Sequence, residues 1–479
     1  MQGIFISLAS VNERTPSGRG NVVESPHCMD LAKDNVSHLY RHFLFSAFGA
    51  ALVSSVFAIV DMAMMGHYQG PDAPAALAII SPVWNIIYAL GLLTGIGASV
   101  LYADLRGQEK KEMDPNVYFT VGLVLTLIIC VFEAVLLNIF LAPLLTSFGA
   151  DATTLPLCLD YLKWIRYGFP LFTLSNFFAG FLRNDKAPGL ATAGIIAPGL
   201  FNVLFDYVFI YVCRMGMEGA GLATVLGMLL GDIIMAGHFF SKKNTLKWVH
   251  FDHPFQKSWA IILSGFSSFL TDAAMGIVNV AFNRQILALY PEKSSAYLSI
   301  YGVLVSLFVF VQCASYGIGQ ASQPLISYNH GAQLYARVKS ILTHALFTCL
   351  GVTLVAFALS ESIPLPLIRI FMTPNDDVLA FAPDAIRPFA LCFLALSFNV
   401  VSCYYFQAIL KSHVAFVVSL LRGALIPLIL VYTLPLAGAD WLWYVMPLTE
   451  FATALLAVYL MIHYTKNLGK TPRIKEKQS

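Results

Sequence analysis

The chain reads Gly199-Leu-Phe-Asn-Val-Leu-Phe-Asp-Tyr-Val-Phe-Ile-Tyr211, an apolar stretch that a single carboxylate, Asp206, interrupts. Asn202 lies four residues before Asp206, which is one helical turn away on the same face. A second acid, Asp61, interrupts another apolar run, Val56-Phe-Ala-Ile-Val-Asp-Met-Ala-Met-Met65. Ionisable groups are costly inside lipid, so they usually mark an ion or substrate pathway. These stretches therefore predict membrane-spanning helices that carry a functional charge.

The composition places nearly all of the chain in a bilayer. Of its 479 residues, 58% are hydrophobic and only 12% are charged, and the mean hydropathy is +0.71. Apolar runs recur that are long enough to cross a hydrocarbon core of about 30 Å. The net charge of +2 gives no reason to expect a nucleic-acid partner. The eight cysteines are scattered without a Cys-x-x-Cys motif, as expected for small buried side chains.

We therefore expect an all-α integral membrane protein with twelve transmembrane helices and short antiparallel connections. The predicted spans are 42–66, 76–104, 116–145, 156–182, 188–212, 217–240, 258–289, 295–326, 337–361, 378–408, 412–435 and 440–464. Lys and Arg concentrate in the even-numbered connections and in the C-terminal tail, and such residues favour the cytoplasmic side. This bias predicts a multi-pass protein of the plasma (inner) membrane with both termini in the cytoplasm.

The halves of the chain repeat. Gly95-Ile-Gly-Ala-Ser99 resembles Gly317-Ile-Gly-Gln-Ala-Ser322 at an offset of 222, and Phe181…Lys186 resembles Phe406…Lys411 at an offset of 225. An offset of six spans preserves orientation, so we predict parallel repeats that form two pseudo-symmetric six-helix lobes. The predicted organisation is a disordered cytoplasmic leader (1–41), an N-lobe (42–240), a cytoplasmic linker (241–257), a C-lobe (258–464) and a basic cytoplasmic tail (465–479).

Five polar side chains of the predicted N-lobe fall at a similar depth. At 1.5 Å per residue, four of them lie about 7–11 Å below the outer edge, namely Asp61, Tyr161, Asp206 and Thr224, and Asn202 falls in the same layer. Two carboxylates held together in low dielectric repel, so at least one prefers a proton or a bound cation. Oxygen ligands suit a hard cation such as Na⁺. The layer thus predicts a site for H⁺ or Na⁺, with no other metal expected.

Other interpretations of single residues stay open. The hydroxyl of Thr224 could return to its own helix, and Tyr161 could be an interfacial anchor. Asp272 in the seventh span could contact a cationic substrate, or it could be a locally satisfied acid. Arg422 and Glu450 could pair with each other or snorkel to the interface. At the repeat offset the second lobe reproduces no acid–amide pair, so the cation site is expected once.

The chain resembles the MATE (multidrug and toxic compound extrusion) transporters over residues 40–465. The motifs that carry the resemblance share their order and spacing with that family, and they are Val60-Asp-Met-Ala-Met-Met-Gly66, Gly95-Ile-Gly-Ala-Ser99, Phe181-Leu-Arg-Asn-Asp-Lys186, Asn202-x-x-x-Asp206, Gly219-Ala-Gly-Leu-Ala-Thr224 and Gly317-Ile-Gly-Gln320. The resemblance implies a Na⁺- or H⁺-driven antiporter that expels organic cations and needs no cofactor.

The resemblance also implies roles for single residues. Asp61, Asn202, Asp206 and Thr224 match the family's first-lobe cation site, and Tyr161 looks like its span 4 tyrosine. Asp272 looks like the second-lobe acid that some members use. Many members carry a proline early in span 1, whereas this chain reads Phe45-Ser-Ala-Phe48 there. Any bend of span 1 would therefore need the nearby Gly49.

These observations predict a secondary active efflux transporter that exchanges external H⁺ or Na⁺ for cytoplasmic organic cations, with the lipid bilayer around it and a monomer as the expected state. The alternative is a flippase or exporter of lipid-linked or glycan precursors with a related fold. Such a protein would need a basic cavity for a diphosphate, whereas Asp61, Asp206 and Asp272 are acidic. An enzyme is not expected, because the sequence holds no His-Glu-x-x-His, Gly-x-Ser-x-Gly or phosphate-loop motif.

Overall fold

A computed structural model describes residues 30–69, 72–108, 113–148, 150, 152, 154–371 and 376–469. Inside the helices, the side chains of residues 50, 52–59, 61–63, 66, 67, 69, 72–75, 78, 294 and 295 fall outside this description. The same holds for most of the predicted leader and for residues 470–479 of the predicted tail. The described residues from Leu31 onward form one compact unit.

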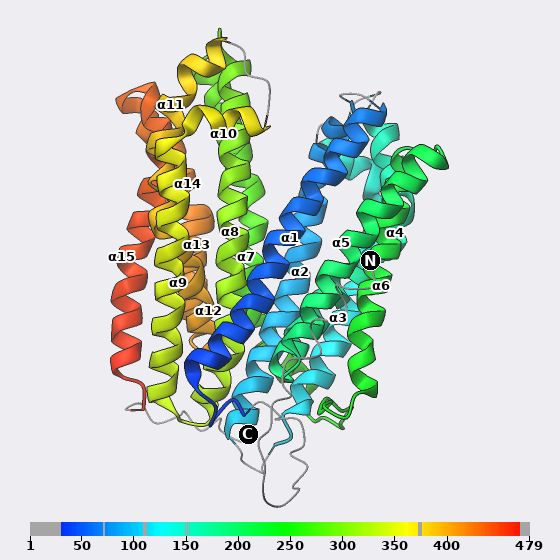
Figure 1. Cartoon of the computed structure of the whole chain (residues 1–479), viewed down its shortest axis with the longest axis vertical. Helices are drawn as coiled ribbons and strands as arrows, with labels where there is room; N and C mark the ends of the chain where they lie inside the picture. The colour runs from blue at the N-terminus through cyan, green and yellow to red at the C-terminus, as the bar shows by residue number, and fades with distance from the viewer. Residues whose placement is uncertain are drawn as a thin grey trace, which may run out of the picture. The chain divides into compact units, whose positions relative to one another are not determined.

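The first six predicted spans are helical. They correspond to α1 (Val36–Gln69), α2 (Asp72–Gln108), α3 (Asn116–Ser147), α4 (Thr154–Asn184), α5 (Pro188–Asp206) with its π-helical continuation η1 (Tyr207–Val212), and α6 (Met217–Ala236) with the 3₁₀ turn η2 (Gly237–Phe240). These helices lie on the right of Figure 1. The side chain of Asn35 accepts hydrogen bonds from the amides of Ser37 (2.9 Å) and His38 (3.3 Å), so it caps α1 at Val36, before the predicted start at residue 42.

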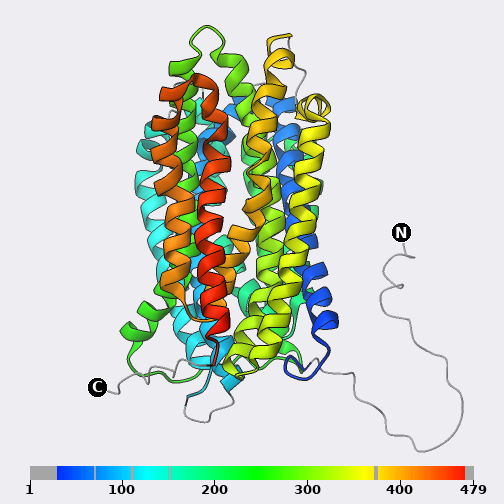
Figure 2. The ribbon, with the colours of Figure 1, turned by 90° about the vertical axis from the view of Figure 1, so that its left-hand side faces the viewer.

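The last six predicted spans are also helical, and several are built from more than one segment. They correspond to α7 (Pro254–Leu289), α8 (Ser294–Gly331), α9 (Tyr335–Ser362), α11 (Asp376–Ala390) with α12 (Phe393–Ala408), α13 (Ser412–Leu420) with η3 (Leu421–Leu425), α14 (Ile426–Thr433) and η4 (Leu434–Ala437), and η5 (Ala439–Tyr444) with α15 (Val445–Lys466). A further short helix, α10 (Pro364–Phe371), lies in a predicted connection. Helix α12 packs against α8, α9, α13 and α15 (Figure 2).

Nine helical segments of the described chain are long and apolar enough to cross a membrane, and the bent pair α11–α12 makes a tenth. Helices α1 and α4 are not among them. On α3, apolar side chains such as Ile128, Val131 and Phe132 are exposed, as lipid-facing residues would be. The chain is therefore a multi-pass, all-helical membrane protein in its described part.

Glycines allow α2 to pack between α4 and α7. A Cβ on Gly95 would lie 2.7 Å from the carbonyl oxygen of Asn176 in α4, and one on Gly97 would lie 2.3 Å from that of Ile261 in α7. A β-carbon cannot approach a backbone so closely, so only glycine permits these contacts. The Gly-x-Gly motif at residues 95–97 thus serves helix packing.

The corresponding motif in α8 does the same. A Cβ on Gly317 would lie 2.8 Å from the Cα of Phe48 in α1, and one on Gly319 would lie 2.3 Å from the ring of Tyr404 in α12. Each Gly-x-Gly helix therefore contacts one helix of its own half of the chain and one of the other half.

Helices α2 and α8 cross at what we call the basic end, where α2 ends and α3 begins (bottom of Figure 1). A Cβ on Gly107 would lie 1.9 Å from the carbonyl oxygen of Tyr328, and one on Gly331 would lie 1.9 Å from that of Asp104. Both the glycines and their partners are 224 positions apart, between the offsets of 222 and 225 that the sequence shows. Asp104 also forms a 2.7 Å ion pair with His330.

Candidate functional site

Three of the predicted cation-site residues form a hydrogen-bonded group between α5 and α6. The Nδ2 of Asn202 donates to Asp206 Oδ1 at 3.3 Å and to the hydroxyl of Thr224 at 3.1 Å. The Thr224 hydroxyl in turn donates to the carbonyl of Ala220 at 2.9 Å, as the back-bonded interpretation predicts. Thr224 therefore serves its own helix and the acid–amide pair at the same time. The Asp206 residue is fully buried.

The local fold presents this acid at a change of helix type. Asp206 is the last residue of α5, and the wider π-helical turn η1 begins at Tyr207. Single-turn π segments recur at functional sites because they redirect side chains. The hydroxyl of Tyr211 in η1 donates to the carbonyl of Met64 in α1 at 2.8 Å. This bond holds η1 beside the turn of α1 that follows Asp61, whose side chain falls outside the described part.

Tyr161 lies against the same region from α4. Its side chain is buried, unlike that of an interfacial anchor. A Cβ on Gly221 would lie 2.0 Å from the carbonyl oxygen of Tyr161, and Gly221 precedes Thr224 by about one turn of α6. The structure thus brings Asn202, Asp206 and Thr224 into one hydrogen-bonded group and places the backbone of Tyr161 next to it.

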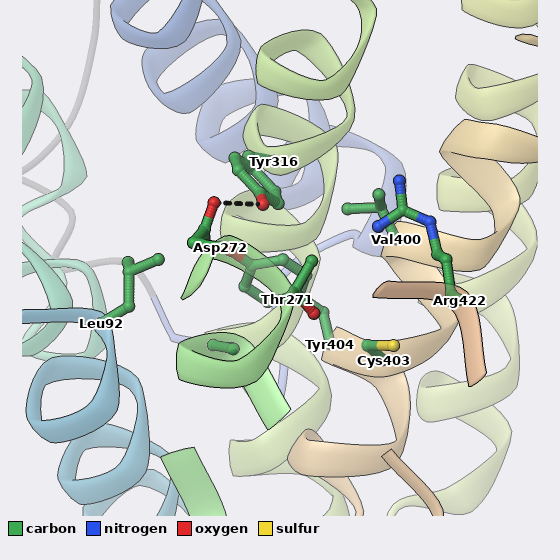
Figure 3. A pocket seen from close by; sticks show the side chains of 9 residues that line it. Leu92, Thr271, Asp272, Tyr316, Val400, Cys403, Tyr404 and Arg422 are labelled. Atoms are coloured by element: carbon green, nitrogen blue, oxygen red, sulfur yellow. Dashed lines mark hydrogen bonds between the residues drawn. The ribbon is translucent and has the colours of Figure 1, made fainter. Parts of the chain in front are cut away.

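Asp272 lines a separate small cavity between α2, α7, α8 and α12 (Figure 3). The hydroxyl of Tyr316 donates to Asp272 Oδ1 at 2.9 Å, and Gln312 Nε2 donates to that hydroxyl at 2.5 Å. Asp272 Oδ2 is buried and accepts no hydrogen bond from any described group. The cavity volume of about 20 Å³ accommodates roughly one water. Tyr404 and Arg422 complete its polar lining.

Arg422 is neutralised by Glu450, so of the two open interpretations the structure shows the ion pair. The Nε of Arg422 lies 2.9 Å from Glu450 Oε1 and 3.1 Å from Oε2, and both residues are buried. Asn399 Nδ2 donates to Glu450 Oε2 at 2.7 Å. Asp272 has no such basic partner among the described ion pairs. The cavity therefore carries one carboxylate that a cation could neutralise.

Sequence reasoning missed two buried acids in the first half of the chain. Glu133 of α3 accepts hydrogen bonds from the Thr173 hydroxyl on both carboxylate oxygens, at 3.2 and 2.9 Å. Asp232 of α6 accepts one from the Ser175 hydroxyl at 2.5 Å. Both interrupt apolar runs, as Asp206 does, so the same sequence pattern could have identified them.

A bundle of long apolar helices with isolated carboxylates buried between them defines a multi-pass membrane transporter. The particular family follows from comparison with known proteins: the MatE family model matches residues 46–208 and 268–433, and the chain belongs to this family. The chain is 23% identical over 439 residues to the multidrug export protein MepA of Staphylococcus saprophyticus. This alignment covers 90% of the chain and 95% of the relative. The MepA of Staphylococcus aureus strain MSSA476 matches with the same identity and coverage.

Solved structures show the same fold. A multidrug resistance MATE family transporter of the MOP superfamily, in an outward-facing conformation, matches with a TM-score of 0.84 and 19% identity over 92% of this chain and 98% of that one. A MOP superfamily transporter from Pyrococcus furiosus matches with a TM-score of 0.83 and 18% identity over the same shares of the two chains. The latter is described as having a binding pocket of reversed polarity, which suggests a different function for that protein.

Proposed function

We propose that this protein is a secondary active multidrug efflux transporter that exchanges external H⁺ or Na⁺ for organic cations by alternating access. The observation that carries the proposal is the group formed by Asp206, Asn202 and Thr224, an acid buried in a membrane helix with an amide and a hydroxyl beside it. The relatives named as multidrug export proteins support the drug-like substrate class. Catalysis of a covalent reaction is not part of the proposal.

We also propose twelve spans in two pseudo-symmetric six-helix lobes. Helices α1 and α4 would complete the count, because each is as long as its neighbours: 34 and 31 residues against 32 for α3. The crossing of α2 and α8 through equivalent glycines supports a two-fold axis along the membrane normal. The basic residues near the basic end assign it, together with both termini, to the cytoplasm of a cell with a plasma (inner) membrane.

The proposed cycle begins when the protein is open to the outside. A proton or Na⁺ reaches Asp206, where the oxygens of Asn202 and Thr224 are within reach of a bound cation, and Asp61 and Tyr161 are expected to contribute. Neutralising the carboxylate removes a buried charge and so changes the relative energies of the two conformations. The ion can shift the equilibrium between the two conformations only by as much as its binding free energies to them differ. No cofactor is required beyond the coupling ion.

The substrate is proposed to bind near Asp272, and the cavity would widen to admit it. A lipophilic cation would neutralise this carboxylate and contact the rings of Tyr316 and Tyr404. A flippase for diphosphate-linked lipids would instead need free basic groups, whereas Arg422 is neutralised by Glu450. The proposed functional unit is a monomer in the bilayer.

The test measures efflux of ethidium from proteoliposomes under an imposed pH gradient or an imposed Na⁺ gradient, for the wild type and for Asp206→Asn. Loss of the acid should lower gradient-driven efflux at least about tenfold, which corresponds to about 1.4 kcal/mol of lost coupling. Asp160→Asn is the matched control, because Asp160 is an exposed acid on α4. Equal efflux by the wild type and Asp206→Asn in the gradient that drives transport would contradict the proposal.

A further inference from the structure

Asp232 is a buried acid, outside the Asp206 group and the Asp272 cavity, whose charge is little compensated. Asp104, Asp185 and Glu450 pair with basic side chains, whereas Glu133 and Asp232 each accept from a single hydroxyl, that of Thr173 and that of Ser175. Asp232 has no basic partner among the described residues, and its Oδ2 is buried without any hydrogen bond. A carboxylate in this position is stable only when a proton or a cation accompanies it.

The position of Asp232 relates it to the Asp206 group. Helices α4 and α6 meet along a seam in which Tyr161 contacts Gly221, and Ser175 contacts Asp232. Between these contacts, Gly168 of α4 packs on Val225 of α6. The seam therefore runs from the predicted cation layer toward the basic end. Asp232 follows Thr224 by eight residues, which is about 12 Å along the helix axis.

A second free oxygen faces α6 beside Asp232. Pro198 has no amide proton, so the carbonyl of Gly194, four residues earlier in α5, loses its helical hydrogen bond. A Cβ on Gly231 would lie 2.5 Å from that carbonyl oxygen, which shows that it points at the backbone next to Asp232. The Ser175 hydroxyl and the Asp232 carboxylate are in contact, and the Gly194 carbonyl lies against the next residue of α6. All three are oxygen ligands of the kind that small hard cations prefer.

Asp232 is the carboxylate at this depth of the α4–α6 seam, and no basic side chain of the described residues pairs with it. On α3, Glu133 accepts a hydrogen bond from Thr173 of α4 at 2.9 Å, and the Cys130 thiol is close enough to Asp232 to interact with it electrostatically. Helix α5 carries no ionisable side chain besides Asp206. Six residues farther along the chain, His238 contacts Asp185 at 2.7 Å, at the basic end. Side chains 52–59 of α1 fall outside the described part.

We propose that Asp232, with Ser175 and the Gly194 carbonyl, is a second binding site for the coupling cation, which the ion occupies after it leaves Asp206 and before it reaches the basic end. This inference rests on the proposed ion-coupled transport. It adds a release site along the α4–α6 seam, so that the ion crosses the membrane through the first half of the chain rather than through the cavity at Asp272. The Asp206 group binds the ion from outside, and Asp232 passes it on.

The experiment uses purified protein in proteoliposomes with ethidium as the substrate probe. One measurement is net efflux under the pH or Na⁺ gradient that drives the wild type, and the two gradients tell which ion uses the site. The other is exchange of ethidium between equal concentrations on both sides, which needs no net ion transfer. Asp232→Asn should lower net efflux at least tenfold and leave exchange within about twofold of the wild type.

Glu133→Gln is the matched control, because it neutralises a buried acid whose two oxygens both lie within hydrogen-bond distance of the Thr173 hydroxyl, and it should leave net efflux within about twofold of the wild type. If Asp232→Asn does not fold, Ser175→Ala retains the acid, removes one ligand and should lower net efflux about three- to tenfold. Asp232→Glu should restore part of the loss.

Wild-type net efflux by Asp232→Asn would overturn this inference, and the proposed function would stand as long as Asp206→Asn fails. An equal loss of net efflux and exchange in Asp232→Asn, without recovery in Asp232→Glu, would assign Asp232 a structural role and would also overturn it. Wild-type efflux by Asp206→Asn would instead remove the proposed function itself.

Discussion

At the scale of single residues, Asn202 fixes the geometry of the cation group. Its Nδ2 donates two hydrogen bonds, one to Asp206 and one to Thr224. Its carbonyl oxygen is therefore the atom left to coordinate a cation. The amide stabilises the charged form of Asp206 when the site is empty and supplies an oxygen when it is occupied.

Thr224 gives the first test at this scale. Thr224→Val keeps the shape of the side chain and removes the acceptor of one Asn202 hydrogen bond, together with one potential cation ligand. A neutral hydrogen bond contributes about 1 kcal/mol, so the concentration of H⁺ or Na⁺ that half-saturates efflux should rise about fivefold. Thr126→Val is the control, because the Thr126 hydroxyl is buried and bonds only the Gly122 carbonyl of its own helix at 2.7 Å. Equal half-saturation in both variants would show that Thr224 is not a ligand.

The residues of the site could be predicted only where a pattern set them apart. Asn202 and Asp206 stood out because an amide and an acid one turn apart are rare in an apolar helix. Asp232 also interrupts an apolar run, but no polar residue lies one helical turn away from it, because its partner Ser175 comes from another helix. Tyr316 and Tyr404 are two of 21 tyrosines, and their proximity to Asp272 depends on the packing of α7, α8 and α12.

At the scale of helices, the two π-helical segments of the described chain adjoin charged residues. Asp206 immediately precedes η1, and Arg422 lies within η3. A π turn inserts one residue and rotates everything after it, so the polar side chain can face the protein interior while the rest of the helix keeps its apolar face toward lipid. Apolar periodicity cannot reveal such turns, because the whole surrounding segment is apolar.

Helix breaks were harder to predict than helix existence. Each predicted span is helical in the described chain within several residues of its predicted bounds. Length and hydropathy alone identify nine of these segments and the bent pair as able to cross a membrane. The predicted span 378–408 instead consists of α11 and α12, bent by 41°. Pro383 and Pro388 precede the break, and proline removes the hydrogen bonds that keep a helix straight. Those prolines could have indicated the bend, whereas helix α10 left no comparable pattern.

Gly49 gives the test for helix α1. Nothing lies within 4 Å of a Cβ built on Gly49, so Gly49→Ala fits the observed helix without a clash. Alanine favours a continuous helix over a bent one by about 0.5–1 kcal/mol, so a bent state should become about two- to fivefold rarer. If transport requires a bend here, turnover should fall by that factor while thermal stability rises. Gly276→Ala in α7, which also has open space, should raise stability without slowing transport; an equal effect of both substitutions on turnover would exclude a bend at Gly49.

At the scale of the whole molecule, the two halves of the chain meet at the basic end through backbone contacts between α2 and α8 and through hydrogen bonds from Arg337 to the carbonyls of Leu31 and Asp34. Each of Gly107 and Gly331 lies directly against a carbonyl of the other helix. The Asp104–His330 ion pair adds a charge-assisted bond across the same contact. Because the two backbones touch at this crossing, they cannot approach further, and the crossing can change only if the helices separate, as alternation between two conformations requires.

The crossing of α2 and α8 makes this alternation testable. A β-carbon at Gly331 would meet the Asp104 carbonyl at 1.9 Å, so Gly331→Ala must separate the two helices in the observed state. Overpacking costs about 1–3 kcal/mol, which should favour the state open at the basic end by about five- to 150-fold. Spin labels at Lys243→Cys and Lys339→Cys, on exposed positions of the two halves at this end, should report a longer distance by pulsed electron resonance.

Gly107→Ala should have the same effect as Gly331→Ala, because the two glycines occupy equivalent places in the crossing. Gly189→Ala is the control at the same end of the molecule, since nothing lies within 4 Å of its Cβ. Unchanged label distances in both Gly107→Ala and Gly331→Ala would mean that the contact yields locally. A change in only one of them would mean that the crossing is not symmetric. A shift in both variants but not in the control would identify the α2–α8 crossing as the place where the halves close.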